Sequence, residues 1–277
     1  MESVMGEAVA VAQEKVGTLP LAPGRTIAYR RIAARPGVRL PEVVFLGGFM
    51  SDMMGRKAEA LSEFCAGRGQ GFLRFDHFAH GQSSGTMEDA TVGGWVEDAS
   101  RVLDRLTEGP LVLVGSSMGG WVMLLTALAR ANRIHGLIGL AAAPDFTEEL
   151  VWNAYTPEEQ AKLMREGKIV EPSPYTERPY VFTRALIEDG RRHLLLNGPI
   201  AIAAPVRLIH GMKDRDVPYK TALRLAEHLV STDVTVTLIK DADHRLSRDE
   251  DLARIADTVA TLSDYSPAAS SAASPAR

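Results

Sequence analysis

Cysteine is nearly absent from this chain, since Cys65 is the only one among 277 residues. A lone cysteine excludes an intramolecular disulfide, a zinc site built from cysteines and a Cys-x-x-Cys redox motif. No apolar run approaches the ~20 residues of a membrane-spanning helix, and no block is rich in lysine and arginine. With a formal net charge of −4, the chain lacks the basic character of a nucleic-acid-binding protein. We therefore expect no membrane span and no nucleic-acid partner.

The N-terminus lacks recognisable targeting features. Residues 1–7 contain no basic region, and the apolar stretch that follows is interrupted by Gln13, Glu14 and Lys15. Neither a secretory signal peptide nor an Arg-rich, acid-poor presequence is visible. We therefore expect a cytoplasmic protein of bacterial type.

Short β-rich runs alternate with longer helical patterns from Arg25 onward, which is typical of a mostly parallel sheet with helices on both faces. Uninterrupted apolar runs such as Leu111 to Val114 are expected where both faces of a sheet are covered. The fold class is therefore α/β. We predict strands near 25–32, 38–46, 71–75, 110–114, 136–141, 205–210 and 233–239, and helices near 56–67, 91–107, 117–130, 219–230 and 248–263.

The alternation breaks over residues 145–200, which carry five prolines and scattered aromatics. We predict two or three short helices here, forming a helical lid insertion. The core then comprises residues 23–144 and 201–264. It follows a flexible lead-in over 1–22 and precedes a low-complexity, disordered tail over 265–277.

The most informative motif is Gly115-Ser116-Ser117-Met118-Gly119, which follows an apolar strand and precedes a helical pattern. Gly-x-Ser-x-Gly in this context predicts a nucleophile elbow, a sharp strand-to-helix turn that exposes the central serine. Ser116 does not fit the frame, because Val114 occupies its glycine position. We therefore predict Ser117 as the nucleophile.

A serine nucleophile needs a base, and the base needs a carboxylate that fixes its tautomer. In one known chain order the acid follows a late strand and the histidine comes last. Asp214 and His244 stand in that order, each just after a predicted strand. Asp216 lies on the same loop as Asp214 and remains an alternative acid.

Acyl transfer also needs N–H donors for the oxyanion that forms when the serine attacks. The residue after the nucleophile, Met118, supplies the first donor. The predicted strand ending in Gly47-Gly48 allows close backbone approach, so we assign the second donor to the N–H of Phe49.

The insertion carries apolar side chains that could contact an acyl chain, and we single out Trp152, Met164 and Phe182. The alternative is that they pack the insertion onto the core. His77 and His80 form His-x-x-His without an acidic third ligand, so we predict no metal site and no cofactor.

With these residues in place, the chain resembles the α/β-hydrolase superfamily. More narrowly, from about Val44 to Leu252 it resembles the mitochondrial acyl-protein (palmitoyl-protein) thioesterases, also known as acyl-glucuronide esterases. The resemblance implies an α/β-hydrolase fold and places the family's catalytic residues on Ser117, Asp214 and His244. Ala79 departs from the family's loop pattern, which has glycine there. The resemblance is carried by Gly47-Gly48-Phe49-Met50-Ser51, Arg74-Phe75-Asp76, Gly115-Ser116-Ser117-Met118-Gly119-Gly120-Trp121, His210-Gly211-Met212-Lys213-Asp214 and Asp243-His244-Arg245.

The sequence thus predicts a serine hydrolase that cleaves carboxylic esters or acyl thioesters through an acyl-enzyme on Ser117. Its partner would be a small acyl ester or thioester, or an acylated protein as the resemblance implies. Two alternatives stay open: a C–C bond or lactone hydrolase with the same triad, and a non-catalytic ligand-binding receptor on the same fold.

Overall fold

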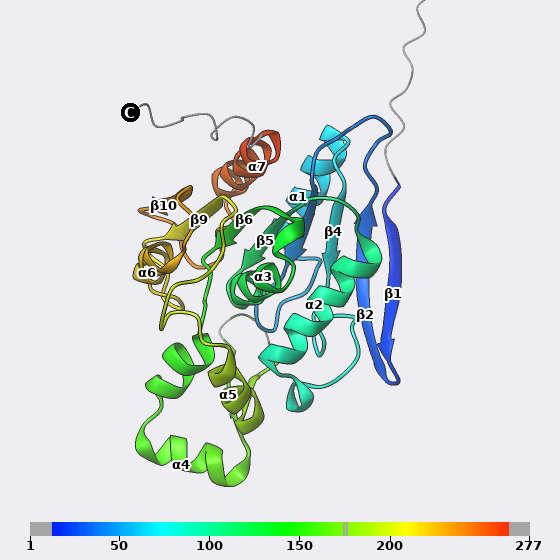
Figure 1. The fold of residues 1–277 in the computed structure, drawn as a ribbon. Coiled ribbons are helices and arrows are strands. Elements are labelled where there is room, and N and C mark those ends of the chain that lie inside the picture. Colours follow the sequence, from blue (N-terminus) through cyan, green and yellow to red (C-terminus); the bar gives the residue numbers. More distant parts are fainter. Residues whose placement is uncertain (1–12, 174, 176, 266–277) are drawn as a thin grey trace, which may run out of the picture.

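The computed structural model describes residues 13–173, 175 and 177–265. These residues form an eight-stranded sheet flanked by helices, with an insertion at one end (Figure 1). The strand order is β1-β2-β4-β3-β5-β6-β9-β10. The strands are β1 Lys15–Ala22, β2 Arg25–Ile32, β3 Glu42–Leu46, β4 Phe72–Phe75, β5 Leu111–Ser116, β6 Ile134–Leu140, β9 Val206–Gly211 and β10 Val234–Ile239.

Six of these strands, from β4 to β10 in the sheet order, run parallel, whereas β2 pairs antiparallel with both β1 and β4. Central strand β5 is buried on both faces, and Leu111, Val112, Leu113 and Val114 are all fully inaccessible to solvent. This two-sided burial explains why the strand is an unbroken apolar run. The predicted mostly parallel sheet is confirmed.

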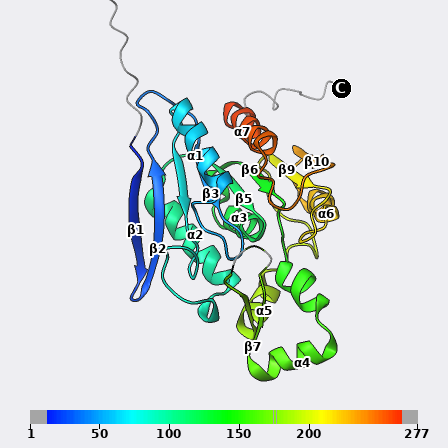
Figure 2. The same cartoon turned by 180° about the vertical axis from the view of Figure 1, so that it is seen from behind.

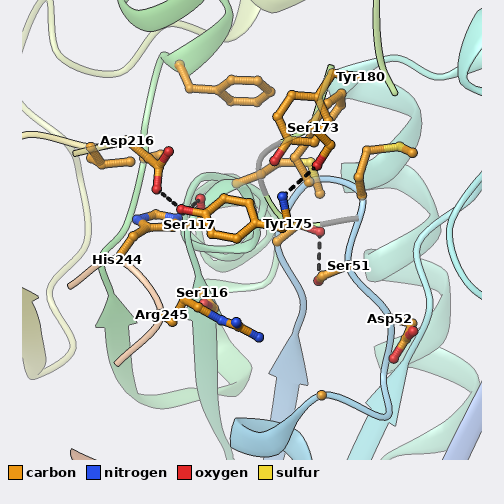
Figure 3. A pocket seen from close by; sticks show the side chains of 18 of the residues that line it. Ser51, Asp52, Ser116, Ser117, Ser173, Tyr175, Tyr180, Asp216, His244 and Arg245 are labelled. Atoms are coloured by element: carbon orange, nitrogen blue, oxygen red, sulfur yellow. Dashed lines mark hydrogen bonds between the residues drawn. The ribbon is translucent and has the colours of Figure 1, made fainter. Parts of the chain in front are cut away.

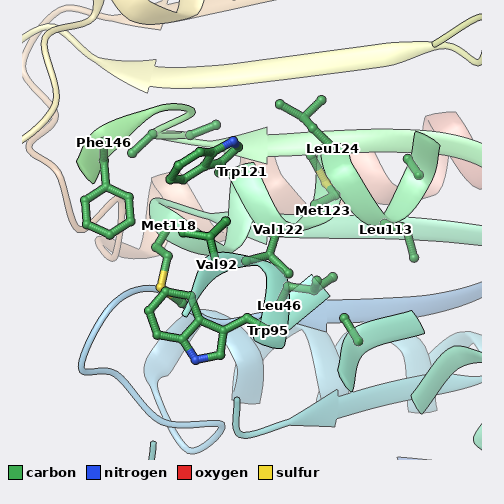
Figure 4. Close-up of a cluster of buried hydrophobic side chains, with 14 of the residues drawn as sticks. Leu46, Val92, Trp95, Leu113, Met118, Trp121, Val122, Met123, Leu124 and Phe146 are labelled. Carbon is green, nitrogen blue, oxygen red and sulfur yellow. The ribbon is translucent and has the colours of Figure 1, made fainter. Parts of the chain in front are cut away.

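Helices cover both faces of the sheet, as predicted (Figures 1 and 2). One face carries α2, α3 and α6 over a large apolar cluster that includes Trp95 and Trp121 (Figure 4), and the other carries α1 and α7 over a second cluster. None of the described helices combines the length and apolarity needed to cross a bilayer. The helices are α1 Arg56–Arg68, α2 Val92–Leu106, α3 Met118–Ala129, α6 Lys220–His228 and α7 Asp249–Asp264.

The start of α2 shows how local sequence fixes these elements. The Thr91 side chain caps the helix by accepting a hydrogen bond from the Gly94 N–H at 3.1 Å. One turn on, the fully buried Trp95 donates its indole N–H to the Phe78 carbonyl at 3.0 Å. Trp95 is therefore a residue of the packed core.

The N-terminal part of the chain differs from the prediction. Residues 15–22, predicted as part of a flexible lead-in, form edge strand β1, whose residue Lys15 pairs with Arg31 at one end. The strand lies at the edge of the sheet, so its side chains alternate only between exposed and half-buried. Residues 1–12 of the lead-in and 266–277 of the tail lie outside the described residues.

The insertion, residues 145–200, lies between β6 and β9 and is called the cap below. Its fully buried Asp145 accepts hydrogen bonds from the N–H groups of Leu195 and Leu196, both at 2.8 Å, which ties the two ends of the cap together. The predicted short helices are present, but the sequence did not predict the hairpin β7–β8. The cap elements are a π-helical turn Thr147–Val151, a 3₁₀ turn Trp152–Ala154, α4 Pro157–Glu166, β7 Lys168–Glu171, β8 Tyr180–Thr183, α5 Arg184–Gly190 and a 3₁₀ turn Arg191–His193.

Candidate active site

The predicted catalytic side chains all follow strands of the parallel part of the sheet. Ser117 comes directly after β5, Asp214 after β9, and His244 after β10. Phe49 follows β3 in the same way. Because the carboxyl ends of parallel strands meet at one edge of the sheet, these four residues converge at that edge. The cap lies beside the same edge (Figure 1).

Ser117 lies at a strained turn. Its backbone angles, φ 55° and ψ −123°, are rare for a residue with a Cβ. The two flanking glycines allow the turn, because a Cβ on Gly115 would lie 2.5 Å from the Gly119 carbonyl oxygen, and one on Gly119 would lie 2.2 Å from the Leu46 oxygen. The Ser117 N–H donates to the Leu140 carbonyl at 2.9 Å, which fixes the turn on β6. This is the geometry of a nucleophile elbow.

Ser117, His244 and Asp214 form one hydrogen-bonded chain. The His244 Nε2 lies 3.1 Å from the Ser117 Oγ, and its Nδ1 lies 2.8 Å from the Asp214 Oδ2. Both distances are ordinary for hydrogen bonds. An imidazole so placed can take the serine proton at one nitrogen while the carboxylate holds the other.

Asp214 is surrounded by donors. Its Oδ1 accepts from the N–H groups of Asp216 at 2.9 Å and Val217 at 2.8 Å, and its Oδ2 also lies 3.1 Å from the buried His210 Nε2. Burial alone raises the pKa of this carboxyl, but hydrogen bonds from His210 and then His244 outweigh it and hold the pKa well below its usual range. Asp214 is therefore ionised at neutral pH, as a partner for an imidazolium must be.

Asp216, the alternative acid, has a different environment. It is exposed, and its carboxylate accepts a hydrogen bond from the Tyr175 hydroxyl of the cap. The structure thus brings Asp214, and not Asp216, into hydrogen-bond contact with His244. Among the described residues, oxygen or nitrogen atoms of Asp214, Asp216 and His244 lie within 4.8 Å of one another and form the one group that could hold a cation. The hydrogen bonds above already engage these atoms.

The two predicted oxyanion donors flank Ser117. Met118 begins α3, and Phe49 sits in the loop after β3. A Cβ on Gly48 would lie 3.3 Å from the Ser117 Cβ, so this loop packs directly against the nucleophile. Within the described part of the chain, neither the Phe49 nor the Met118 N–H has a hydrogen-bond acceptor. Both groups are thus available to a substrate oxygen.

A pocket of about 500 Å³ opens beside Ser117. The side chains of Ser117, His244, Tyr175 and Asp216 come together there (Figure 3). Part of the pocket is lined by apolar and aromatic side chains from the loop after β3 and from the cap. They are Phe49, Met50, Phe146, Leu150, Val151, Tyr180 and Phe182.

Only one of the three predicted substrate contacts lines this pocket. Phe182, on β8, is part of the lining, whereas Trp152 and Met164 are not. The Trp152 ring lies under the guanidinium of Arg191, 4.4 Å from its centroid, and Met164 stands on α4 beside the buried Leu163. Trp152 packs against the main apolar cluster, as the alternative interpretation has it, in which these residues pack the insertion onto the core.

Sequence reasoning missed two residues beside the site. Lys57 of α1 donates to the carbonyl of Arg245, the residue that follows His244, and burial lowers the pKa of Lys57 to about 8. Tyr175 links the cap to the loop of Asp214 through Asp216. A lysine in a helix and a tyrosine in a Pro-rich loop carry no motif, so no sequence signal singled them out.

Comparison with known proteins identifies the fold's relatives. A model of the Alpha/beta hydrolase family matches residues 43–258. Palmitoyl-protein thioesterase ABHD10, mitochondrial, of Mus musculus is 39% identical over 239 residues, which cover 86% of this chain and 79% of that protein. The Homo sapiens protein of the same name is 38% identical, with 86% and 76% covered.

Solved structures agree. A crystal structure of a protein from Agrobacterium vitis S4 superimposes with a TM-score of 0.85 at 38% identity, covering 91% of this chain and 99% of that one. Alpha/beta hydrolase domain-containing protein 10 from mouse gives a TM-score of 0.81 at 37% identity, with 90% and 98% covered.

The predicted cytoplasmic location is wrong by this comparison, because the curated relatives carry "mitochondrial" in their names. The prediction depended on the absence of an Arg-rich, acid-poor presequence from the N-terminal sequence.

Proposed function

The chain belongs to the alpha/beta hydrolase family and is a hydrolase related to thioesterases; from that premise we propose that Ser117 is its nucleophile and that it cleaves acyl thioesters and carboxylic esters. The predicted resemblance and the predicted enzyme class are confirmed by the family match. Acylated proteins enter the proposal as substrates because the mouse and human relatives are named palmitoyl-protein thioesterases.

One observation carries the proposal. The Ser117 Oγ at the strained elbow lies 3.1 Å from the His244 Nε2, and the His244 Nδ1 lies 2.8 Å from a buried, ionised Asp214. A hydroxyl, an imidazole and a carboxylate in this sequence make a weak nucleophile reactive at neutral pH.

The chemistry follows from the geometry. His244 takes the Ser117 proton as the Oγ attacks the acyl carbon, and the resulting oxyanion accepts hydrogen bonds from the Met118 and Phe49 N–H groups. His244, now charged and paired with Asp214, donates its proton to the leaving thiolate or alkoxide. An acyl-enzyme on Ser117 remains. Water then attacks it, with His244 again as base, and releases the carboxylic acid and the free hydroxyl.

A fluorophosphonate probe tests the nucleophile, because it phosphonylates only activated serines. We expect the parent protein to be labelled and Ser117→Ala to be neither labelled nor active. The matched control is Ser116→Ala, which removes the neighbouring hydroxyl and should keep labelling. Persistent labelling of Ser117→Ala, or its loss in Ser116→Ala alone, would reject the assignment.

The substrate class needs a separate test with matched oxygen and sulfur acyl substrates of graded chain length. The pocket of about 500 Å³, with its apolar lining, favours acyl groups that fill it. We expect kcat/KM to rise with chain length until the pocket is full. Equal rates for two-carbon and long acyl groups would contradict the proposal that the pocket holds the acyl chain.

A further inference from the structure

The orientation of the Phe49 amide depends on a tight turn. The Ser51 N–H and Oγ both donate to the Gly48 carbonyl, at 3.2 and 3.0 Å, and close the turn from Gly48 to Ser51. Met50 within it has φ 56°, in the left-handed region that side chains disfavour. A turn that contains such a residue costs free energy and persists only where its surroundings hold it.

The ring of Phe49 keeps this turn in place, because it lies inside a cage of five other rings. Its ring is stacked on Phe182 at 5.3 Å with an interplanar angle of 7°. The other four surround it at 5.5 to 6.3 Å: Tyr180, Phe146, His80 and Trp95. Aromatic pairs in such arrangements contribute beyond their buried area. Rotation of the Phe49 residue would break these contacts.

The cage has a fixed side and a side made by the cap. On the fixed side, the Trp95 indole N–H and the His80 Nδ1 both bind the Phe78 carbonyl, at 3.0 and 2.9 Å. On the other side, Phe182 and Tyr180 stand on β8, whose one strand partner among the described residues is β7, in a separate two-stranded sheet. The position of the cap hairpin therefore decides whether the cage is complete.

We propose that Phe182 is a positioning residue for the Phe49 amide, so that seating of the β7–β8 hairpin completes the oxyanion hole. The inference rests on the proposed function, in which that amide binds the oxyanion. Phe182 lines the pocket as well, so an acyl chain in the pocket touches the ring that orients the amide. Substrate binding and oxyanion stabilisation are then linked through one stacked pair.

The test uses a two-carbon acyl ester, so that lost packing against a long acyl chain does not enter. Removal of an oxyanion donor typically lowers kcat by about 10²–10³-fold, and a misplaced donor loses part of that. We expect Phe182→Ala to lower kcat about tenfold, with KM nearly unchanged. Affinity for methylboronic acid, which forms a tetrahedral adduct on the serine without filling the pocket, should fall by the same factor.

Three further variants separate positioning from general damage. Phe182→Tyr keeps the stacked ring and should rescue most of the kcat that Phe182→Ala loses. Phe182→Leu keeps most of the volume and should lose kcat without unfolding the cap. Leu163→Ala truncates a fully buried cap residue that is not one of the cage residues, and it should keep both kcat and boronate affinity. The pH profile of kcat/KM should keep its shape in Phe182→Ala, because the triad is untouched.

The inference is overturned if Phe182→Ala keeps the parental kcat, if Leu163→Ala loses as much, or if only KM changes. Failure of the proposed function has a different signature, namely turnover by Ser117→Ala in the same assay. An inactive Ser117→Ala together with a fully active Phe182→Ala would reject the positioning role and leave the nucleophile in place.

Discussion

Replacing Asp214 by asparagine gives a sharp test of the site, because the structure dictates how the new amide must turn. The Oδ1 position faces two backbone donors, the N–H groups of Asp216 and Val217. The Oδ2 position faces His244 and His210. An amide oxygen therefore stays at Oδ1 and its NH₂ group points at His244.

With the amide in this orientation, His244 can no longer act as a base. The NH₂ group donates to the His244 Nδ1, so the imidazole must carry its proton on Nε2, which faces the Ser117 Oγ at 3.1 Å. His244 then cannot accept the serine proton. In the opposite orientation the NH₂ group would face two backbone N–H donors, and each buried donor left without an acceptor would cost about 1–3 kcal/mol of free energy. We expect kcat to fall about 10⁴-fold, equivalent to about 5 kcal/mol in the barrier.

The assay compares Asp214→Asn with Asp216→Asn, two residues away, using kcat on one oxygen ester and its matched thioester. Asp216 is exposed and contacts Tyr175 rather than His244, so its variant should lose less than about tenfold, the scale of a surface polar contact. Thermal melting checks that both variants fold. The reasoning is refuted if Asp214→Asn, correctly folded, keeps more than a tenth of the activity, or if the order of the two variants is reversed.

Other parts of the structure give further predictions. In Gly119→Ala the new Cβ would meet the Leu46 carbonyl oxygen at 2.2 Å, and overpacking of about 1–3 kcal/mol should lower Tm by about 2–10 °C and also reduce kcat. Lys57→Met removes the donor to the Arg245 carbonyl and should lower kcat about tenfold, whereas Lys57→Arg should restore part of it. Burial lowers the pKa of His77 to about 3, whereas its pKa in the unfolded chain is about 6.5. Between these pH values His77 binds a proton only in the unfolded chain, so the free energy of unfolding decreases as the pH falls from about 6.5 toward 3. In His77→Phe, denaturant unfolding across that range should show a pH slope smaller by about 1.4 kcal/mol per pH unit, and an unchanged slope would contradict the assignment.

The sheet and the main helices could be predicted because their sequence patterns are dictated by burial. Strand β5 is apolar throughout since both of its faces are covered, and α2 carries a threonine cap and buried residues at helical spacing. The edge strand β1 was not predicted, because it is not buried and so has no such pattern. Its side chains are exposed or half-buried, and it contains Gly17 and Pro20, which argue against a central strand but are tolerated at an edge.

Backbone conformations set by sterics were partly visible. Ala79, where the resemblance implied a glycine, adopts φ 66° in the left-handed region. A glycine would adopt this backbone geometry without strain, whereas alanine occupies the position with some strain. The hairpin β7–β8 was not visible, because its strands have only four residues each and the prolines between them mask any alternation.

The residues of the candidate site differ in the same way in how far the sequence could predict them. Ser117, Asp214, His244 and the Phe49 loop each follow a strand of the parallel sheet, so their order in the chain was enough to predict that they meet at one edge. The cap residues have no such constraint. Which aromatic side chain lines the pocket depends on how a short hairpin packs against a loop more than 100 residues earlier, since Phe182 stacks on Phe49 while Trp152 pairs with Arg191 inside the cap. The convergence of candidate catalytic groups that topology sets can therefore be predicted from the sequence, whereas contacts set by side-chain packing between distant segments need the structure.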